Sequence, residues 1–114
     1  MIAVIFEVVP SVGEHHHYLD LAGELRARLQ AVDGFVSVER FESLTTRGKL
    51  LSLSFWRDEE AVRCWRETEE HRAAQQAGRG GVFASYRLRV ASVLRDYGLE
   101  DREEAPGDSR ALHG

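Results

Sequence analysis

Three adjacent histidines, His15, His16 and His17, are the first residues whose types could do chemistry. An imidazole can bind a metal ion, and its unperturbed pKa of about 6.5 suits proton abstraction near neutral pH. Successive helical residues turn by about 100°, so three neighbours point in three directions and do not share one metal ion. His16 and Asp20 face each other at i and i+4, but catalytic zinc usually takes three protein ligands. We therefore predict a polar helix start, with at most one of His15 and His17 turned toward the core or a cleft near Tyr18 and Leu21.

His71 is the second candidate base, and it follows Trp65 by six residues. Six residues of regular helix rotate the side chain by about 240° beyond a full turn, so we expect Trp65 and His71 on different faces. A pocket role for His71 and an ion pair with Glu67 at i−4 both stay open. Cys64 shares the face of His71, but two helical turns separate them by about 10 Å, too far for a thiolate–imidazole pair.

Aromatic side chains could form the wall of a site for a planar ligand. Trp56 and Trp65 are large enough to clamp a ring, although core packing is the commoner use of each. Tyr86, in an alternating segment, falls on the strand face opposite Arg87 and Arg89. For these two arginines we favour ion pairs between subunits over binding of an anionic substrate.

The elements that must position these residues follow from hydrophobic periodicity and turn signals. An acidic first turn after Asp58, an N-cap, begins the second helix, and Gly78 closes it. The predicted elements are a strand over 2–9, a helix over 14–32, strands over 35–44 and 49–56 joined by a turn, a helix over 59–78, and a strand over 82–94. This β-α-β-β-α-β order predicts an α+β, ferredoxin-like fold with an antiparallel sheet. We assign residues 1–98 to one domain and 99–114 to a flexible, polar C-terminal tail.

The first predicted strand is apolar on both of its faces. Ile2, Val4 and Phe6 lie on one face, while Ala3 and Ile5 lie on the other. A sheet that helices cover on one side only should show polar residues on its second side. We therefore expect a second copy of the chain to cover that side, which gives a homodimer through the open sheet face.

Composition excludes several classes of protein. The chain has 15 Lys and Arg against 19 Asp and Glu, a net charge of −4, so we expect no nucleic-acid partner. No apolar run approaches the roughly 18 residues of a spanning helix, and the first residues do not resemble a signal peptide. Cys64 is the single cysteine. We predict a cytoplasmic domain with no membrane segment and no metal site.

The segment FWRDEEAVRCWRETEEHRAAQQAGR, residues 55–79, resembles the signature region of the antibiotic biosynthesis monooxygenase family. The resemblance extends over most of residues 1–98 and includes Tyr86 and Arg89 on the last strand. It implies a dimeric α+β barrel, ferredoxin-like in each chain. It also implies a group of proteins whose best-known members oxidise phenolic or quinol-like substrates with dioxygen and without a metal or a flavin. We therefore expect an oxidoreductase that needs no cofactor.

The resemblance also suggests roles for individual residues. His71 or a histidine of the first helix is the base, and Trp65 and Trp56 hold the substrate ring. Ser52, which stands where the polyketide oxygenases tend to have asparagine, donates a hydrogen bond. Tyr86, Tyr18 and His17 complete the expected contacts with a small aromatic ligand.

Two departures from the resemblance keep other functions open. Haem-degrading relatives have a histidine ten residues after the tryptophan that matches Trp65, and this chain has Gln75 there; the chain also contains no asparagine. A glutamine amide is a poor axial ligand for haem iron. The first alternative to a monooxygenase is a non-catalytic dimeric module that binds small molecules or serves a stress response. A haem-binding protein or an isomerase is a less favoured alternative.

Overall fold

Strand β1 (Ile2–Pro10) lies inside a four-stranded antiparallel sheet in which β3 (Leu50–Trp56) and β4 (Phe83–Ser92) flank it. Strand β2 (Phe35–Glu42) pairs with β3 and completes the order β2-β3-β1-β4. This computed structural model describes residues 1–68, 71–72, 75–76 and 78–114. The sheet and its two helices confirm the predicted ferredoxin-like α+β fold, and the hairpin between β2 and β3 falls where the turn was expected.

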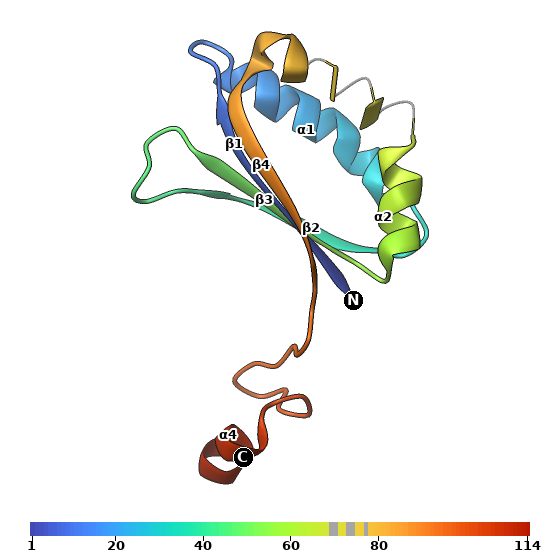
Figure 1. The fold of residues 1–114 in the computed structure, drawn as a ribbon, viewed down its shortest axis with the longest axis vertical. Coiled ribbons are helices and arrows are strands. Elements are labelled where there is room, and N and C mark those ends of the chain that lie inside the picture. Colours follow the sequence, from blue (N-terminus) through green and yellow to red (C-terminus); the bar gives the residue numbers. More distant parts are fainter. Residues whose placement is uncertain (69–70, 73–74, 77) are drawn as a thin grey trace.

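Helices α1 (His15–Gln30) and α2 (Glu59–Arg66) both lie on one face of the sheet (Figure 1). The even-numbered residues of β1 point toward these helices, as their packing in the core shows. That core forms two clusters rather than one. The first contains Val8, Tyr18, Leu50 and Val82, and the second contains Leu29, Trp56, Ala61 and Trp65.

Helix α2 is shorter than the sequence predicts. Asp58 caps its first turn as expected, because its carboxylate accepts the Ala61 N–H at 2.9 Å. The helix ends at Arg66, whereas the periodicity predicted a helix to residue 78. Thr68 then begins a new turn, since its hydroxyl accepts the backbone N–H of His71 at 3.2 Å, as an N-cap does. Residues 69–70, 73–74 and 77 of the predicted helix lie outside the described residues.

Among the described residues, no helix lies on the second face of the sheet (Figure 1). Odd-numbered residues of β1 lie on this face, and Ile5 and Val9 are only half-buried there. The Glu7 carboxylate lies on this face between two cations. Its oxygens are 2.6 Å from Arg89 Nη1 and 3.1 Å from Lys49 Nζ. The Arg89 and Lys49 hydrogen bonds hold the pKa of Glu7 below its ordinary value. Arg89 thus has an ion pair within its own chain, on the face opposite Tyr86 as predicted.

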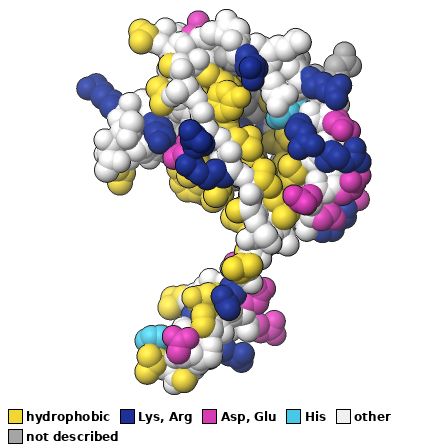
Figure 2. Space-filling view, in the orientation of Figure 1, with side chains coloured by type: hydrophobic (Ala, Val, Ile, Leu, Met, Phe, Trp, Pro, Cys, Tyr) yellow, Lys and Arg dark blue, Asp and Glu magenta, His cyan; other side chains and the backbone are white. Residues whose placement is uncertain are grey.

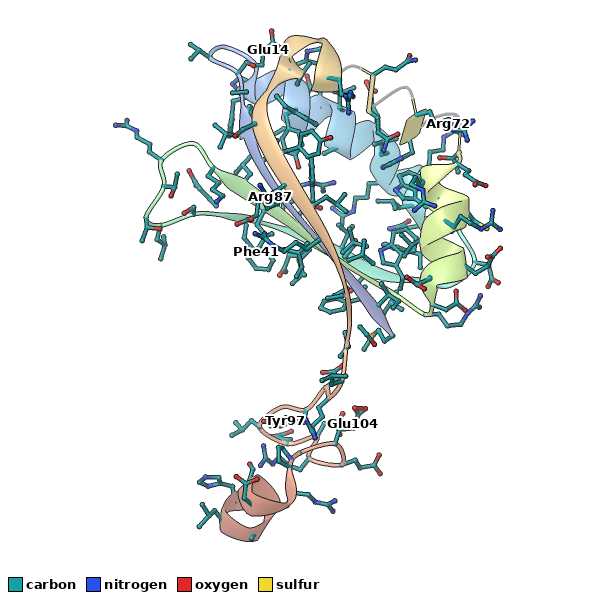
Figure 3. The ribbon with its side chains drawn as sticks, in the orientation of Figure 1. Glu14, Phe41, Arg72, Arg87, Tyr97 and Glu104 are labelled. Atoms are coloured by element: carbon teal, nitrogen blue, oxygen red, sulfur yellow. The ribbon has the colours of Figure 1, made fainter. Side chains whose placement is uncertain are left out.

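Residues 93–114 leave the sheet after β4 and form an arm that points away from the domain (Figure 3). A short helix, α4 (Gly107–His113), ends the arm in the segment where the sequence predicted no periodic structure. The Arg102 guanidinium lies 5.2 Å from the ring centre of Tyr97 and donates to the Gly114 carbonyl at 2.8 Å. Ala105 is buried inside the arm. The assignment of 1–98 as a domain and 99–114 as a flexible tail stays a prediction.

Between α1 and β2, Gly34 positions α2 against the edge of the sheet. Its φ of +90° lies in the left-handed region, and its carbonyl accepts the Arg57 N–H at 2.7 Å. A Cβ at this position would lie 2.8 Å from the Cβ of Ala61 in α2.

Gly34→Ala should therefore lower the free energy of unfolding by roughly 2 kcal/mol, from backbone strain together with the clash. Gly13→Ala is the matched control, because Gly13 has a similar φ of +83° and a Cβ there would meet no described atom within 4 Å. Denaturant unfolding of both variants measures the difference. Equal losses in the two variants would contradict the close approach of Gly34 and Ala61.

Candidate functional site

A cavity of about 350 Å³ lies between the sheet and the two helices. Figure 2 shows hydrophobic side chains gathered in a hollow between β4 and α2, with basic side chains around it. Tyr86, Leu88 and Val90 of β4 line the cavity and are each about half exposed, at 48%, 49% and 47%. The cavity therefore meets solvent along this edge strand. A space of this size suits a small organic ligand.

The cavity exists because small side chains occupy the middle of β3. Ser52 and Ser54 point toward the helices from the two central inward positions, and Ala22 lies on the facing side of α1. The two core clusters fill the space at either end of α1. Ser54 is buried and its hydroxyl accepts the Trp56 indole N–H at 2.9 Å. The Ser52 hydroxyl makes no hydrogen bond within the described part of the chain, so it is a free donor at the cavity surface.

Both tryptophans belong to the core and to the cavity wall at once. Trp56 is 2% exposed and packs edge-on against Phe35, with ring centres 5.3 Å apart. Trp65 of α2 is 7% exposed. Each lines the cavity with part of its ring. The two expected roles of these residues, core packing and aromatic wall, are therefore compatible.

His71 lies against Trp65, with ring centres 5.2 Å apart and the planes inclined by 55°. The expectation that the two side chains would occupy different faces is wrong, because it assumed one continuous helix and the chain restarts at Thr68. The Nδ1 atom of His71 is buried and has no hydrogen-bond partner among the described residues. Glu67 pairs with Arg63 at 2.9 Å instead of with His71.

Burial lowers the pKa of His71 below its ordinary value, and a hydrogen bond toward the backbone of Arg66 offsets this only in part. The imidazole is therefore neutral at neutral pH, as a general base must be. Burial also raises the pKa of Tyr18, against the opposing effect of the nearby Arg40 guanidinium. Tyr18 thus keeps its phenolic proton and can donate it in a hydrogen bond.

The structure gathers most of the residues that the sequence singled out. Those that line the cavity are Tyr18, Ser52, Trp56, Trp65, His71 and Tyr86. His17 is exposed, its Nδ1 bonds to Glu14 at 2.9 Å, and it is not among the residues that line the cavity. Gln75, at the position of the haem ligand in some relatives, also lines the cavity.

Sequence reasoning missed the cations of the cavity, Arg40, Arg66 and Arg79. Arg40 shares an inward face with Ser52, its partner across the β2–β3 ladder. Strict alternation from the start of β2 does not fix this position, because the register shifts between Phe35 and Ser37. The available signal was the hairpin pairing, which puts Arg40 opposite a small polar residue.

Metal-binding and membrane-spanning features are both absent from the described ranges. Within residues 1–68, 71–72, 75–76 and 78–114, no group of three His, Cys, Asp or Glu side chains could hold a metal ion. No helix within those ranges is long and apolar enough to cross a membrane.

The site is thus a largely apolar cavity beneath the helices of an antiparallel sheet, with the neutral His71 imidazole among its lining residues. The family model named antibiotic biosynthesis monooxygenase matches residues 1–77. The chain belongs to this family.

Three known proteins show how the chain relates to the family. A protein of Pyricularia oryzae named jasmonate monooxygenase ABM is 47% identical over 93 residues, which are 82% of this chain and 43% of that protein. The chain thus spans less than half the length of this relative. The uncharacterised protein YqjZ of Bacillus subtilis is 34% identical over 97 residues, covering 82% of this chain and 79% of that one. The solved structure of a candidate antibiotic biosynthesis monooxygenase from Deinococcus radiodurans shares the fold, with a TM-score of 0.77, 14% identity and coverage of 86% and 97%.

The lowered pKa of His71 makes a prediction about stability. An unfolded histidine takes up a proton below about pH 6.5, whereas folded His71 does so only at lower pH. The folded state should therefore lose stability as the pH falls from about 7.5 to 5, relative to His71→Gln. Urea unfolding at several pH values measures this difference. Parallel curves for wild type and His71→Gln would contradict the buried, neutral imidazole.

Proposed function

We propose that the protein is a monooxygenase that oxidises a small organic substrate with dioxygen inside this cavity, without a cofactor. The observation that carries the proposal is the neutral His71 imidazole against Trp65 in a cavity of about 350 Å³ with mostly apolar walls. Membership of the antibiotic biosynthesis monooxygenase family supports the same reaction class.

The proposed chemistry needs little from the protein. His71 removes a proton from the substrate, and the resulting electron-rich anion reduces dioxygen. At a CH₂ group beside an aromatic ring, one oxygen atom enters the substrate as a carbonyl and the other leaves as water. Trp65 and Trp56 position the ring, while the Ser52 hydroxyl donates a hydrogen bond to the developing oxyanion. The apolar walls around these groups reduce the contact of the anion with bulk water.

The substrate class that we propose is a phenol, a hydroquinone or a polyketide-like aromatic compound. Tyr86, Trp56 and Tyr18 line the cavity and offer the aromatic surfaces that such a ring would contact. The Pyricularia oryzae relative is named for jasmonate, so jasmonate also belongs among the compounds to test.

Oxygen consumption by the metal-stripped protein, measured with a panel of anthrones, hydroquinones and jasmonate, tests the activity. We expect uptake that survives chelation and falls by about 100-fold or more in His71→Ala, the usual loss when a general base is removed. His17→Ala changes a histidine outside the cavity and should keep full activity. Full activity in His71→Ala would remove His71 from the mechanism. Binding of panel compounds without oxygen uptake would favour the non-catalytic module.

The open sheet face carries a second proposal, that the protein is a homodimer through this face. Half-buried apolar side chains gather there from β1 and β3, among them Ile5, Leu53 and Phe55. A sheet face of this kind is stable when a second copy covers it.

Leu53→Lys should separate the dimer, because it places a charge in the middle of the proposed interface. Light scattering after size exclusion should give twice the chain mass of 12.9 kDa for the wild type and the single mass for the variant. Leu19→Lys is the control, since Leu19 is 39% exposed on α1 and should leave the mass unchanged. A wild type of single mass at micromolar concentration would overturn this proposal.

A further inference from the structure

Arg40 brings a positive charge into the cavity from strand β2. Its side chain lies on the same face as Ser52, its cross-strand partner, and both line the cavity. Such partners have Cβ atoms about 5 Å apart. The Arg40 guanidinium and the Ser52 hydroxyl therefore form one polar patch on an otherwise apolar wall. The Nε atom of Arg40 is buried and has no hydrogen-bond partner in the part of the chain that is described.

The described residues that line the cavity with Arg40 include two more arginines and no carboxylate. Arg66 and Arg79 line the same cavity, and none of the described lining residues is an aspartate or a glutamate. Tyr18 lies near the Arg40 guanidinium and keeps its proton, so it is a neutral neighbour. The described lining thus carries three arginines and no carboxylate, whereas the chain as a whole has a net charge of −4.

A buried guanidinium N–H without an acceptor is unfavourable, because it has lost its hydration and gained no bond. A ligand acceptor would restore the missing bond. The Nε and one terminal nitrogen of a guanidinium form a planar fork that fits the two oxygens of a carboxylate. We propose that the ligand of this cavity is an apolar carboxylic acid whose carboxylate is bound by Arg40.

This inference rests on the proposed function in taking the cavity as the substrate site, and it adds the chemical class of the substrate. The reacting part of the molecule lies along the apolar walls, which include Trp56 and Trp65. Arg40 does not act on the reacting atoms, so it is a positioning and specificity residue.

Binding of acids and their methyl esters tests the inference without any turnover. The probes are three matched pairs, jasmonate, 1-naphthylacetate and cinnamate with their esters, at about pH 8, where the carboxylates are ionised. Fluorescence of Trp56 and Trp65 reports occupancy, because both line the cavity. The wild type should bind at least one acid about 10-fold more tightly than its ester, the range expected for a charge-assisted hydrogen bond.

The variants separate Arg40 from general charge effects. Arg40→Met should abolish the preference for the acid, and Arg40→Lys should keep part of it. Arg47→Met is the matched control, because it removes the same charge from the exposed β2–β3 turn and should keep the preference. Without ligand, Arg40→Met should melt no lower than the wild type, since it removes a buried nitrogen that has no partner among the described residues.

Each outcome decides the inference. A wild type that shows no acid preference in any pair, including one that binds none of the acids, overturns it, as does a preference that persists in Arg40→Met. Acid preference without oxygen uptake would leave this inference standing and reject the monooxygenase. Oxygen uptake with equal binding of acids and esters would do the reverse.

Discussion

Two serines in the middle of β3 set the space on which the rest of the site depends. The helices cover one face of the sheet, so every inward side chain must fill the layer between them. Leu50 and Trp56 do this at the ends of β3, where the two core clusters form. Ser52 and Ser54 do not, and α1 is held at both ends too far away to collapse onto them. A cavity within a stable domain is the result.

The position of the candidate base comes from a break in regular structure. A continuous second helix would carry His71 away from Trp65, but the Thr68 hydroxyl starts a new turn and the two rings lie 5.2 Å apart. Burial against the indole then keeps the imidazole neutral. The place of His71 and its proton affinity thus have one origin, the interruption of the helix between Trp65 and Thr68.

Periodicity and turn chemistry predicted the sheet, its order of elements and the N-cap at Asp58, because each depends on residues close together in the chain. The end of α2 could not be predicted in this way, since the residues around Thr68 favour helix and only the cap hydrogen bond marks the break. Arg40 was missed for a related reason. Its inward position depends on a register shift near the start of β2 and on its pairing with Ser52. Neither can be read from the alternation of polar and apolar residues along the strand.

The division of labour along β3 has a consequence for how such a domain diversifies. The two clusters that hold the fold together include neither Ser52 nor Ser54, and these two side chains floor the cavity. Replacement of Ser52 would resize the cavity while the two clusters keep their packing, whereas replacement of Ser54 would also remove the acceptor of the buried Trp56 indole N–H. Substitution at such a position can therefore change which ligand the cavity binds without a change of fold.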